Sequence, residues 1–263
     1  MAKNCVKAMY VIDGGYMDCD KGLMTANTDN GKTIKIPVPV LLLDTTEGWV
    51  MIDTGMNPQV IEDPVPCWGE WLAQDVPVHM TVENDFRTVF AKLGITCDDI
   101  KYVINTHMHH DHLGGNRFFP NAIHIAQKEE YRFATCPDEA FSSRYTVKTD
   151  MPEPLNWQLA EGECEPLPGI VLIPTPGHSP GHQAILLRDL PGVGPFIYCG
   201  DAVYMEENWE KNIGPGICWN PPMALKSMAK LKQIQSLTGA YVMVSHDWDY
   251  FYTLPHAPEK FHL

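Results

Sequence analysis

The sequence has no apolar run long enough to cross a membrane. In its 263 residues no stretch approaches the ~20 consecutive apolar residues that a spanning helix needs. The first residues, MAKNCVKAMYVID, also lack the long apolar segment of a secretory signal. We therefore expect a cytoplasmic protein with no membrane partner.

Paired cysteines and an excess of positive charge are also missing. The eight cysteines are scattered and none forms a C-x-x-C pair, which argues against a cysteine-based zinc site or redox motif. Lys and Arg number 19 against 33 Asp and Glu, so the formal net charge is −14. Because an acidic chain repels polyanions, we expect no nucleic-acid partner.

The remaining composition is that of an ordinary globular protein, without a visible repeat or low-complexity linker. We expect a single domain over residues 1–263. Helical spacing of apolar residues predicts helices at 83–93, 127–135 and 222–238, and the Pro-rich polar segment 136–168 is expected to be a long loop. Short runs rich in Val and Ile predict buried strands at 38–43, 49–52, 102–104, 170–173, 184–187, 196–199 and 240–244.

A stretch of unusual chemistry, NTHMHHDHLGGN, occupies residues 105–116. It could be a solvated loop, so its partners elsewhere in the chain decide its meaning. Polar residues follow four of the predicted strands directly, where a rigid sheet can present them in loops. These residues are His107, His178, Asp201 and His246. One such histidine would more often be structural, but four strand ends together favour a metal centre.

Neutral imidazoles and carboxylates are suitable ligands for zinc and similar divalent ions. Because neighbouring side chains in a tight loop diverge, the 107–112 segment can supply two ligands to each of two metals. His178 and His246 would complete one metal each, and Asp201, with two carboxylate oxygens, would bridge them. We therefore expect two divalent ions, zinc in the first place, with iron, manganese and cobalt also compatible. The full predicted ligand set is His107, His109, Asp111, His112, His178, Asp201 and His246.

The motifs that carry these residues resemble those of the metallo-β-lactamase superfamily. The resemblance implies an α+β (α/β) fold, an αββα sandwich of two mixed β-sheets flanked by helices, with the metals at one edge. In chain order the motifs are IDTG at 52–55, THMHHDH at 106–112, PTPGHSPGH at 174–182, GD at 200–201 and SHD at 245–247.

Within the superfamily, the chain is most similar to the N-acyl homoserine lactonases. The sequence DAVY at 201–204 resembles their D-A-x-Y motif, and pyridoxolactonase-type enzymes share much of the pattern. Asp201 stands where antibiotic-cleaving members commonly have cysteine, which argues against β-lactamase activity. Typical glyoxalase II has a C-terminal helical domain, whereas none follows residue 247 here. One departure is His110, a position that is often Phe in the best-known lactonases.

The resemblance implies a dinuclear lactone hydrolase that opens N-acyl homoserine lactones through a hydroxide held between the metals. Tyr204 would stabilise the oxyanion, and Asp111 would shuttle a proton to the leaving alkoxide. The alternatives are a pyridoxolactonase-type enzyme, a glyoxalase II-like thioester hydrolase, a phosphodiester hydrolase and a non-catalytic metal-dependent binding protein. The expected partner is a small-molecule lactone, and a homodimer is left open.

Several residues near these motifs have weaker interpretations. Asp53 and His182 are expected to orient metal ligands by hydrogen bonding, with turn roles nearly as well supported. His110 is expected in the pocket wall. Trp68 and Trp71 could cap an apolar pocket, lie in a subunit interface or pack in the core. The remaining histidines have no partner pattern and are expected at the surface or in the core: His79, His124, His256 and His262.

Overall fold

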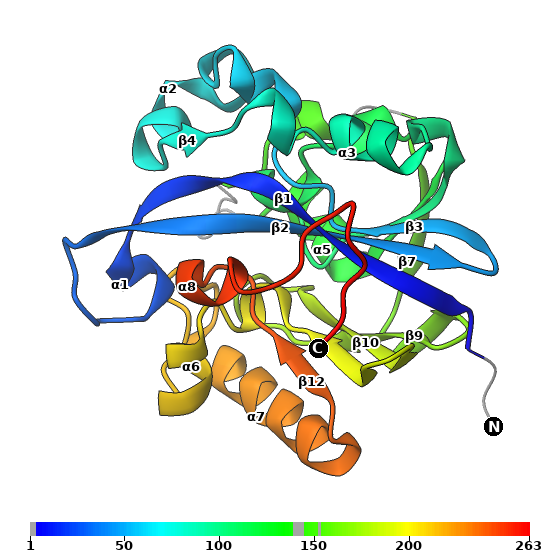
Figure 1. Ribbon diagram of the computed structural model, residues 1–263. Coiled ribbons are helices and arrows are strands. Elements are labelled where there is room, and N and C mark those ends of the chain that lie inside the picture. Colours follow the sequence, from blue (N-terminus) through cyan, green and yellow to red (C-terminus); the bar gives the residue numbers. More distant parts are fainter. Residues whose placement is uncertain (1–3, 139–144, 152–153) are drawn as a thin grey trace.

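The computed structural model describes residues 4–138, 145–151 and 154–263. Two β-sheets face each other and helices cover their outer faces (Figure 1). The first sheet contains β1 (Val6–Asp20), β2 (Thr33–Thr45), β3 (Gly48–Ile52), β4 (Val78–His79), β5 (Ile100–Ile104), β6 (Ile123–Gln127) and β7 (Asn156–Ala160). The second contains β8 (Cys164–Leu167), β9 (Ile170–Pro174), β10 (Gln183–Leu190), β11 (Gly194–Tyr198) and β12 (Tyr241–Met243). The helices are α1 (Lys21–Met24), α2 (Val65–Asp75), α3 (Phe86–Leu93), α4 (His110–Leu113), α5 (Lys128–Thr135), α6 (Glu206–Lys211), α7 (Pro221–Thr238) and α8 (Trp248–Phe251).

Both sheets are mixed. The strand order is β4-β1-β2-β3-β5-β6-β7 in the first sheet and β12-β11-β10-β9-β8 in the second. Parallel pairing of β3 with β5 and of β11 with β12 is combined with antiparallel pairing elsewhere in each sheet. The predicted αββα sandwich of two mixed sheets is therefore confirmed.

The core lies between the sheets and continues under the helices. Leu41 of β2 and Ile185 of β10 belong to the cluster between the two sheets. Leu42 points to the other side of β2 and packs with Phe86 and Phe90 of α3. Because side chains alternate across a strand, a strand covered on both faces is apolar throughout, which explains the continuous run at 38–43.

All seven predicted strands and the three predicted helices are present, with small shifts at their ends. The helix predicted at 83–93 begins at Phe86, because residues 82–84 form a separate 3₁₀ turn and Asp85 caps the helix. Gly94 and Gly239 end α3 and α7 with φ of 72° and 68°, a left-handed conformation that glycine adopts at little cost. Within the described part of the chain, none of the helices combines the length and apolar character required to cross a bilayer.

The prediction of one long loop at 136–168 is wrong in its second half, where β7 and β8 lie. Both strands are at the edges of their sheets and leave several side chains exposed or half-buried, so neither has an apolar run. Strand β6 was missed as well, because IHIAQ is short and interrupted by polar residues. Residues 139–144 and 152–153 of this segment lie outside the described residues.

A buried carboxyl near the first sheet predicts a pH-dependent stability. Asn57 donates from Nδ2 to Asp150 Oδ1 at 2.6 Å, while Oδ2 has no partner among the described residues. Burial raises the pKa of Asp150 to about 7. Because the folded-state pKa lies above the unfolded value, the contribution of this carboxyl to the free energy of unfolding is complete at low pH. That contribution is lost as pH rises towards 7.

We therefore expect Asp150→Asn to become more stable than the wild type as pH increases from about 5 to 8, by on the order of 2–3 kcal/mol. Urea unfolding of both proteins across this range would measure the difference. The exposed Asp98, replaced by Asn, serves as the control and should show no such trend. A constant difference between Asp150→Asn and the wild type would contradict the expectation.

Candidate metal centre

The seven predicted ligands meet where four loops of the sandwich converge. The residues from His107 to His112 follow β5, and His178 lies in the loop between β9 and β10. Asp201 is in the 3₁₀ turn after β11, and His246 follows β12. All seven side chains are buried, and the most accessible, His109, is only 8% exposed.

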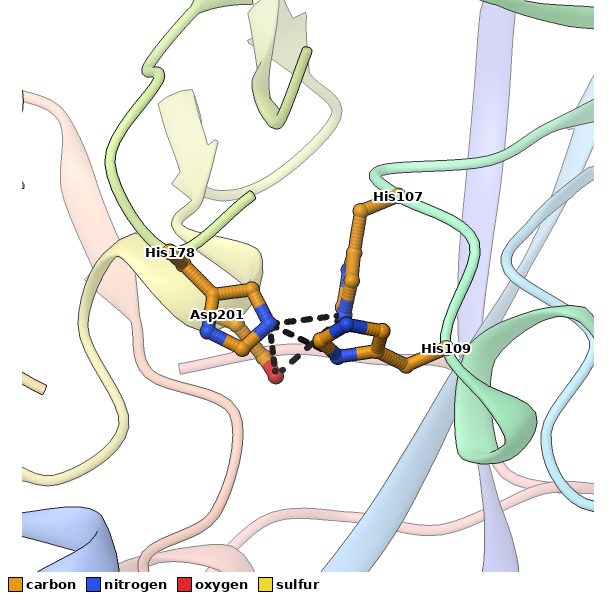
Figure 2. Close-up of side chains that lie close together, drawn as sticks. All are labelled: His107, His109, His178 and Asp201. Carbon is orange, nitrogen blue, oxygen red and sulfur yellow. Dashed lines mark hydrogen bonds and ion pairs between the residues drawn. The ribbon is translucent and has the colours of Figure 1, made fainter. Parts of the chain in front are cut away.

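These side chains form two adjacent groups. We call His107, His109, His178 and Asp201 the three-histidine group, and Asp111, His112 and His246 the second group. In each group the facing ligand atoms all lie within 4.8 Å of one another. Figure 2 shows His107 and His109, from one loop, turned towards His178 and Asp201. The structure thus brings together residues that are far apart in the sequence.

Asp201 lies between the two groups. Its Oδ2 is 3.5 Å from His107 Nε2 and 3.4 Å from His178 Nε2. Its Oδ1 is 3.2 Å from Nε2 of both His112 and His246. Each carboxylate oxygen therefore faces a different group, as a carboxylate shared by two ions requires.

Hydrogen bonds behind two of the histidines determine which ring nitrogen faces the site. His178 Nδ1 is 2.9 Å from the carbonyl of Ile217, and His246 Nδ1 is 2.8 Å from that of Pro37. Since a carbonyl can only accept, each Nδ1 carries the hydrogen, and in the neutral imidazole Nε2 then presents a lone pair to the site. Burial, together with the neighbouring histidines, holds the pKa of His107 and of His109 well below the usual range, so these imidazoles are neutral.

Such an arrangement fits divalent metal ions. His178 Nε2 is 3.0 Å from His107 Nε2 and 2.9 Å from His109 Nδ1, so ring nitrogens from two loops converge on one point. Within the described residues, His112 Nε2 and Asp201 Oδ1 are buried with no hydrogen-bond partner. Although burial acts to raise the pKa of Asp201, the surrounding histidines, led by His112, hold it well below the usual range. The site therefore offers buried donors of the type that divalent metals bind.

Asp53 and His182 hold the ligands from behind. Asp53 Oδ2 is 2.8 Å from His112 Nδ1, and its carboxylate also accepts from the backbone N–H and the hydroxyl of Thr106. These bonds hold Asp53 at a φ of 57°, which is uncommon outside glycine. His182 Nε2 accepts from the backbone N–H of Asp201 at 2.9 Å. Both residues thus make hydrogen bonds that orient predicted ligands.

Glu130, which has no role predicted from the sequence, also contacts the ligand loops. It lies near the start of α5, is 2% exposed, and accepts three hydrogen bonds from those loops. No local signal marks it, because KEEYR has the composition of an exposed first helical turn. Only the packing of α5 against the loops makes this carboxylate an internal group.

A cavity adjoins the metal groups, and both Tyr204 and His110 line it. The Tyr204 hydroxyl is 2.9 Å from His178 Nδ1. The rings of His110 and Trp68 pack edge to face, with centroids 4.6 Å apart. Trp68 is buried in the apolar cluster around this cavity, whereas Trp71 is 46% exposed.

The four remaining histidines have contacts elsewhere in the fold. His79 stacks on Tyr16 at the first sheet's edge, and His124 is buried with Nε2 at 2.9 Å from the carbonyl of Phe119. His256 packs on Phe251, and His262 is exposed near the end of the chain. Their surface and core positions agree with the sequence interpretation.

Comparison with known proteins agrees with the geometry. The profile of the "Metallo-beta-lactamase superfamily" matches residues 34–246. The N-acyl homoserine lactonase AttM of Azorhizobium caulinodans is 34% identical over 257 residues, covering 95% of this chain and 97% of that protein. The N-acyl homoserine lactonase AiiA of Bacillus thuringiensis subsp. kurstaki is 32% identical over 242 residues, covering 92% and 94%.

A solved structure adds a third comparison. It is an N-acyl homoserine lactone hydrolase with the product N-hexanoyl-L-homoserine bound at the catalytic metal centre. It superposes with a TM-score of 0.88 at 31% identity and covers 97% of this chain and 99% of its own. With the profile match over most of the sequence, and two His/Asp groups that fit divalent metals, the chain belongs to the metallo-β-lactamase superfamily.

Proposed function

We propose that this protein is a dinuclear metal-dependent hydrolase that opens the ring of N-acyl homoserine lactones. The observation that carries the proposal is the Tyr204 hydroxyl, which lies in the same cavity as both metal groups, beside His178. The curated relatives described above, at 32–34% identity, are N-acyl homoserine lactonases, which supports the same activity.

The metal ligands proposed are the seven residues of the two groups, with zinc as the first choice of ion. When bound, two divalent ions would activate water and polarise the lactone carbonyl. The protein's own contribution is to hold the ligands rigidly, through Asp53 behind His112 and through the Pro37 carbonyl behind His246.

The hydrogen bonds of Tyr204 leave its proton free for substrate. His178 Nδ1 lies 2.9 Å from both the Ile217 carbonyl oxygen and the Tyr204 hydroxyl oxygen, and the carbonyl requires that Nδ1 carries the hydrogen. The Tyr204 oxygen therefore accepts, and its O–H remains available to donate into the cavity. Burial raises the pKa of Tyr204 well above the usual range, so the hydroxyl stays protonated and can stabilise a developing oxyanion.

Asp111 is the proposed proton carrier. Its Oδ2 lies 3.5 Å from His112 Nε2 and 3.6 Å from His246 Nε2, and the residue lines the cavity. In lactone opening, water gives its oxygen to the carbonyl carbon and a proton to Asp111. As the ring C–O bond breaks, Asp111 returns the proton to the alkoxide, and the product is the open-chain hydroxy acid.

The cavity wall suits a substrate with an apolar portion. The apolar lining residues include Met17, Met24, Ile36 and Val76. Flexible methionines adapt to chains of different shape, which fits an acyl group better than a compact charged substrate.

A panel of substrates tests the proposal directly. We expect the zinc-loaded protein to hydrolyse N-acyl homoserine lactones faster than pyridoxolactone, glutathione thioesters or phosphodiesters, as followed by proton release. A higher kcat/KM for a thioester or a phosphodiester would replace the lactonase assignment. Absence of turnover throughout would favour the metal-dependent binding protein.

The role of Tyr204 gives a more specific prediction. Tyr204→Phe should keep the fold and both metals while lowering kcat about ten- to a hundredfold. The decrease should fall on kcat because the donor matters most when charge develops on the oxygen. Metal analysis and lactone kinetics on the same preparation would measure both.

Tyr198→Phe is the matched control. The Tyr198 hydroxyl is also buried but has no hydrogen-bond partner in the described residues, and its ring belongs to the core between the sheets. Its removal should leave kcat unchanged. If Tyr204→Phe behaved like this control, Tyr204 would be a packing residue and the main argument for lactones over thioesters would be lost.

A further inference from the structure

Glu130 is a buried carboxylate that accepts hydrogen bonds from two different loops. Its Oε1 accepts from the backbone N–H of Met108 at 3.0 Å. Its Oε2 accepts from the hydroxyl of Ser179 at 2.6 Å and from the backbone N–H of Gly181 at 2.9 Å. One carboxylate thus joins two loops that come from different sheets.

Both loops carry residues of the three-histidine group. Met108 lies between His107 and His109, and Ser179 directly follows His178. The distance between the histidines of the two loops is short, because His178 Nε2 lies 2.9 Å from His109 Nδ1. Any movement of one loop against the other would therefore separate the ligands of this group.

The second group has different supports. Asp53 Oδ2 is 2.8 Å from His112 Nδ1, and the carbonyl of Pro37 is 2.8 Å from His246 Nδ1. Glu130 has no hydrogen bond to Asp111, His112 or His246 among the described residues. The affinity for a metal ion should therefore depend on Glu130 to different extents in the two groups.

The backbone of α5 packs directly on the loop that carries His178 and Gly181. A Cβ added at Gly181 would lie 2.2 Å from the backbone nitrogen of Glu130 and 2.7 Å from its Cα. Only glycine permits this approach, which places the carboxylate within reach of both loops. The contact is therefore built into the packing and does not depend on a flexible side chain alone.

We propose that Glu130 is a positioning residue that fixes the three-histidine group, so that the ion bound there depends on Glu130 and the ion of the second group does not. The inference rests on the dinuclear site of the proposed function. The carboxylate holds two loops at the separation the ligands need, as hydrogen-bonded groups behind metal ligands commonly do. Glu130 neither lines the cavity nor belongs to either metal group, so its effect on activity is indirect.

The test compares Glu130→Gln with Glu129→Gln. An amide accepts at only one end and presents hydrogens at the other, so Gln keeps the shape but loses the bonds to one loop. Glu129 is the neighbouring acid and pairs with Arg132 on the surface, which makes it a matched control. Zinc-loaded proteins are titrated with a chromophoric chelator, and anomalous scattering from crystals assigns the occupancy of each position.

We expect Glu130→Gln to bind one zinc with unchanged affinity and the other about 10–100-fold more weakly. The weakened ion should be the one held by His107, His109 and His178. Glu129→Gln should match the wild type at both positions. Ser179→Ala removes a single hydrogen bond and should weaken the same ion by a smaller factor, which keeps the test decisive if Glu130→Gln does not fold.

Three outcomes would overturn the inference: unchanged affinity at both positions, equal weakening of both, or selective loss of the second-group ion. Failure of the proposed function is recognised separately, because it depends on the wild type alone. A wild-type protein that binds two zinc ions but hydrolyses no lactone rejects the activity and leaves the positioning role testable. A wild type that binds fewer than two ions rejects the dinuclear site itself.

Discussion

Replacing Asp201 with alanine is expected to remove activity almost entirely and to lower the metal content at both positions. The two carboxylate oxygens face different groups, at 3.4–3.5 Å from His107 and His178 and at 3.2 Å from His112 and His246. The substitution therefore removes one donor from each proposed ion and also one negative charge from a buried cluster of histidines. Both effects weaken the binding of the metal ions.

The expected loss of kcat/KM is on the order of 10³-fold or more. Bound ions supply several kcal/mol of transition-state stabilisation, and about 1.4 kcal/mol corresponds to a factor of ten. Elemental analysis and lactone kinetics on the same protein would measure occupancy and rate together. Asp201→Asn keeps the shape and one oxygen, so it should lose less metal than the alanine variant.

The exposed Asp189 provides the surface control, since its replacement by alanine should change neither metal content nor rate. Full activity with two ions in Asp201→Ala would show that the carboxylate does not bridge. Loss of a single ion would place Asp201 in one group only.

Removal of the metals is the second change with a large expected effect. The ligands come from loops after β5, β9, β11 and β12, so the ions would link both sheets. Ions that bind the folded site and scarcely the unfolded chain stabilise by mass action, by ~4 kcal/mol for each ion at a thousandfold excess over its Kd. For a chain of this size that corresponds to a decrease in Tm of roughly 8–16 °C for each ion removed.

His178 Nε2 lies 3.0 Å from His107 Nε2 and 2.9 Å from His109 Nδ1, so an ion bound there would connect two loops of the fold. Calorimetry before and after chelation, with metal content determined on both samples, would measure the shift, and added zinc should reverse it. The Asp201→Ala protein should respond less to chelation than the wild type. An unchanged Tm in protein shown to be metal-free would mean that the site and the fold are only weakly coupled.

Much of the site could be predicted because its ligand types are concentrated in short motifs. Four histidines and an aspartate within 107–112 are recognisable without any tertiary information. His178, Asp201 and His246 were found because each follows an apolar strand, and that strand signal is local. The superfamily resemblance rests on the same motifs and was confirmed by the profile match to residues 34–246.

The elements that were missed lack a local signal. Strand β1 spans 15 residues, but polar residues and a Gly-Gly pair interrupt it, and its register with β2 shifts between Asp13 and Tyr16. Strands β7 and β8 are defined by the neighbours they pair with at the sheet edges. For such segments, pairing across the sheet decides the structure more than the sequence of the segment does.

By itself the sequence determined the fold family, the ligand types and the order of the motifs, because each depends on residues close together in the chain. Tertiary structure alone decided which oxygen of Asp201 faces which group, that the Tyr204 hydroxyl lies beside His178, and that Glu130 joins the two ligand loops. Glu130 shows the reason, since its partners Met108 and Ser179 lie 22 and 49 residues away from it. Contacts over such separations are fixed by the packing of sheets and helices, and no local pattern of residues encodes them.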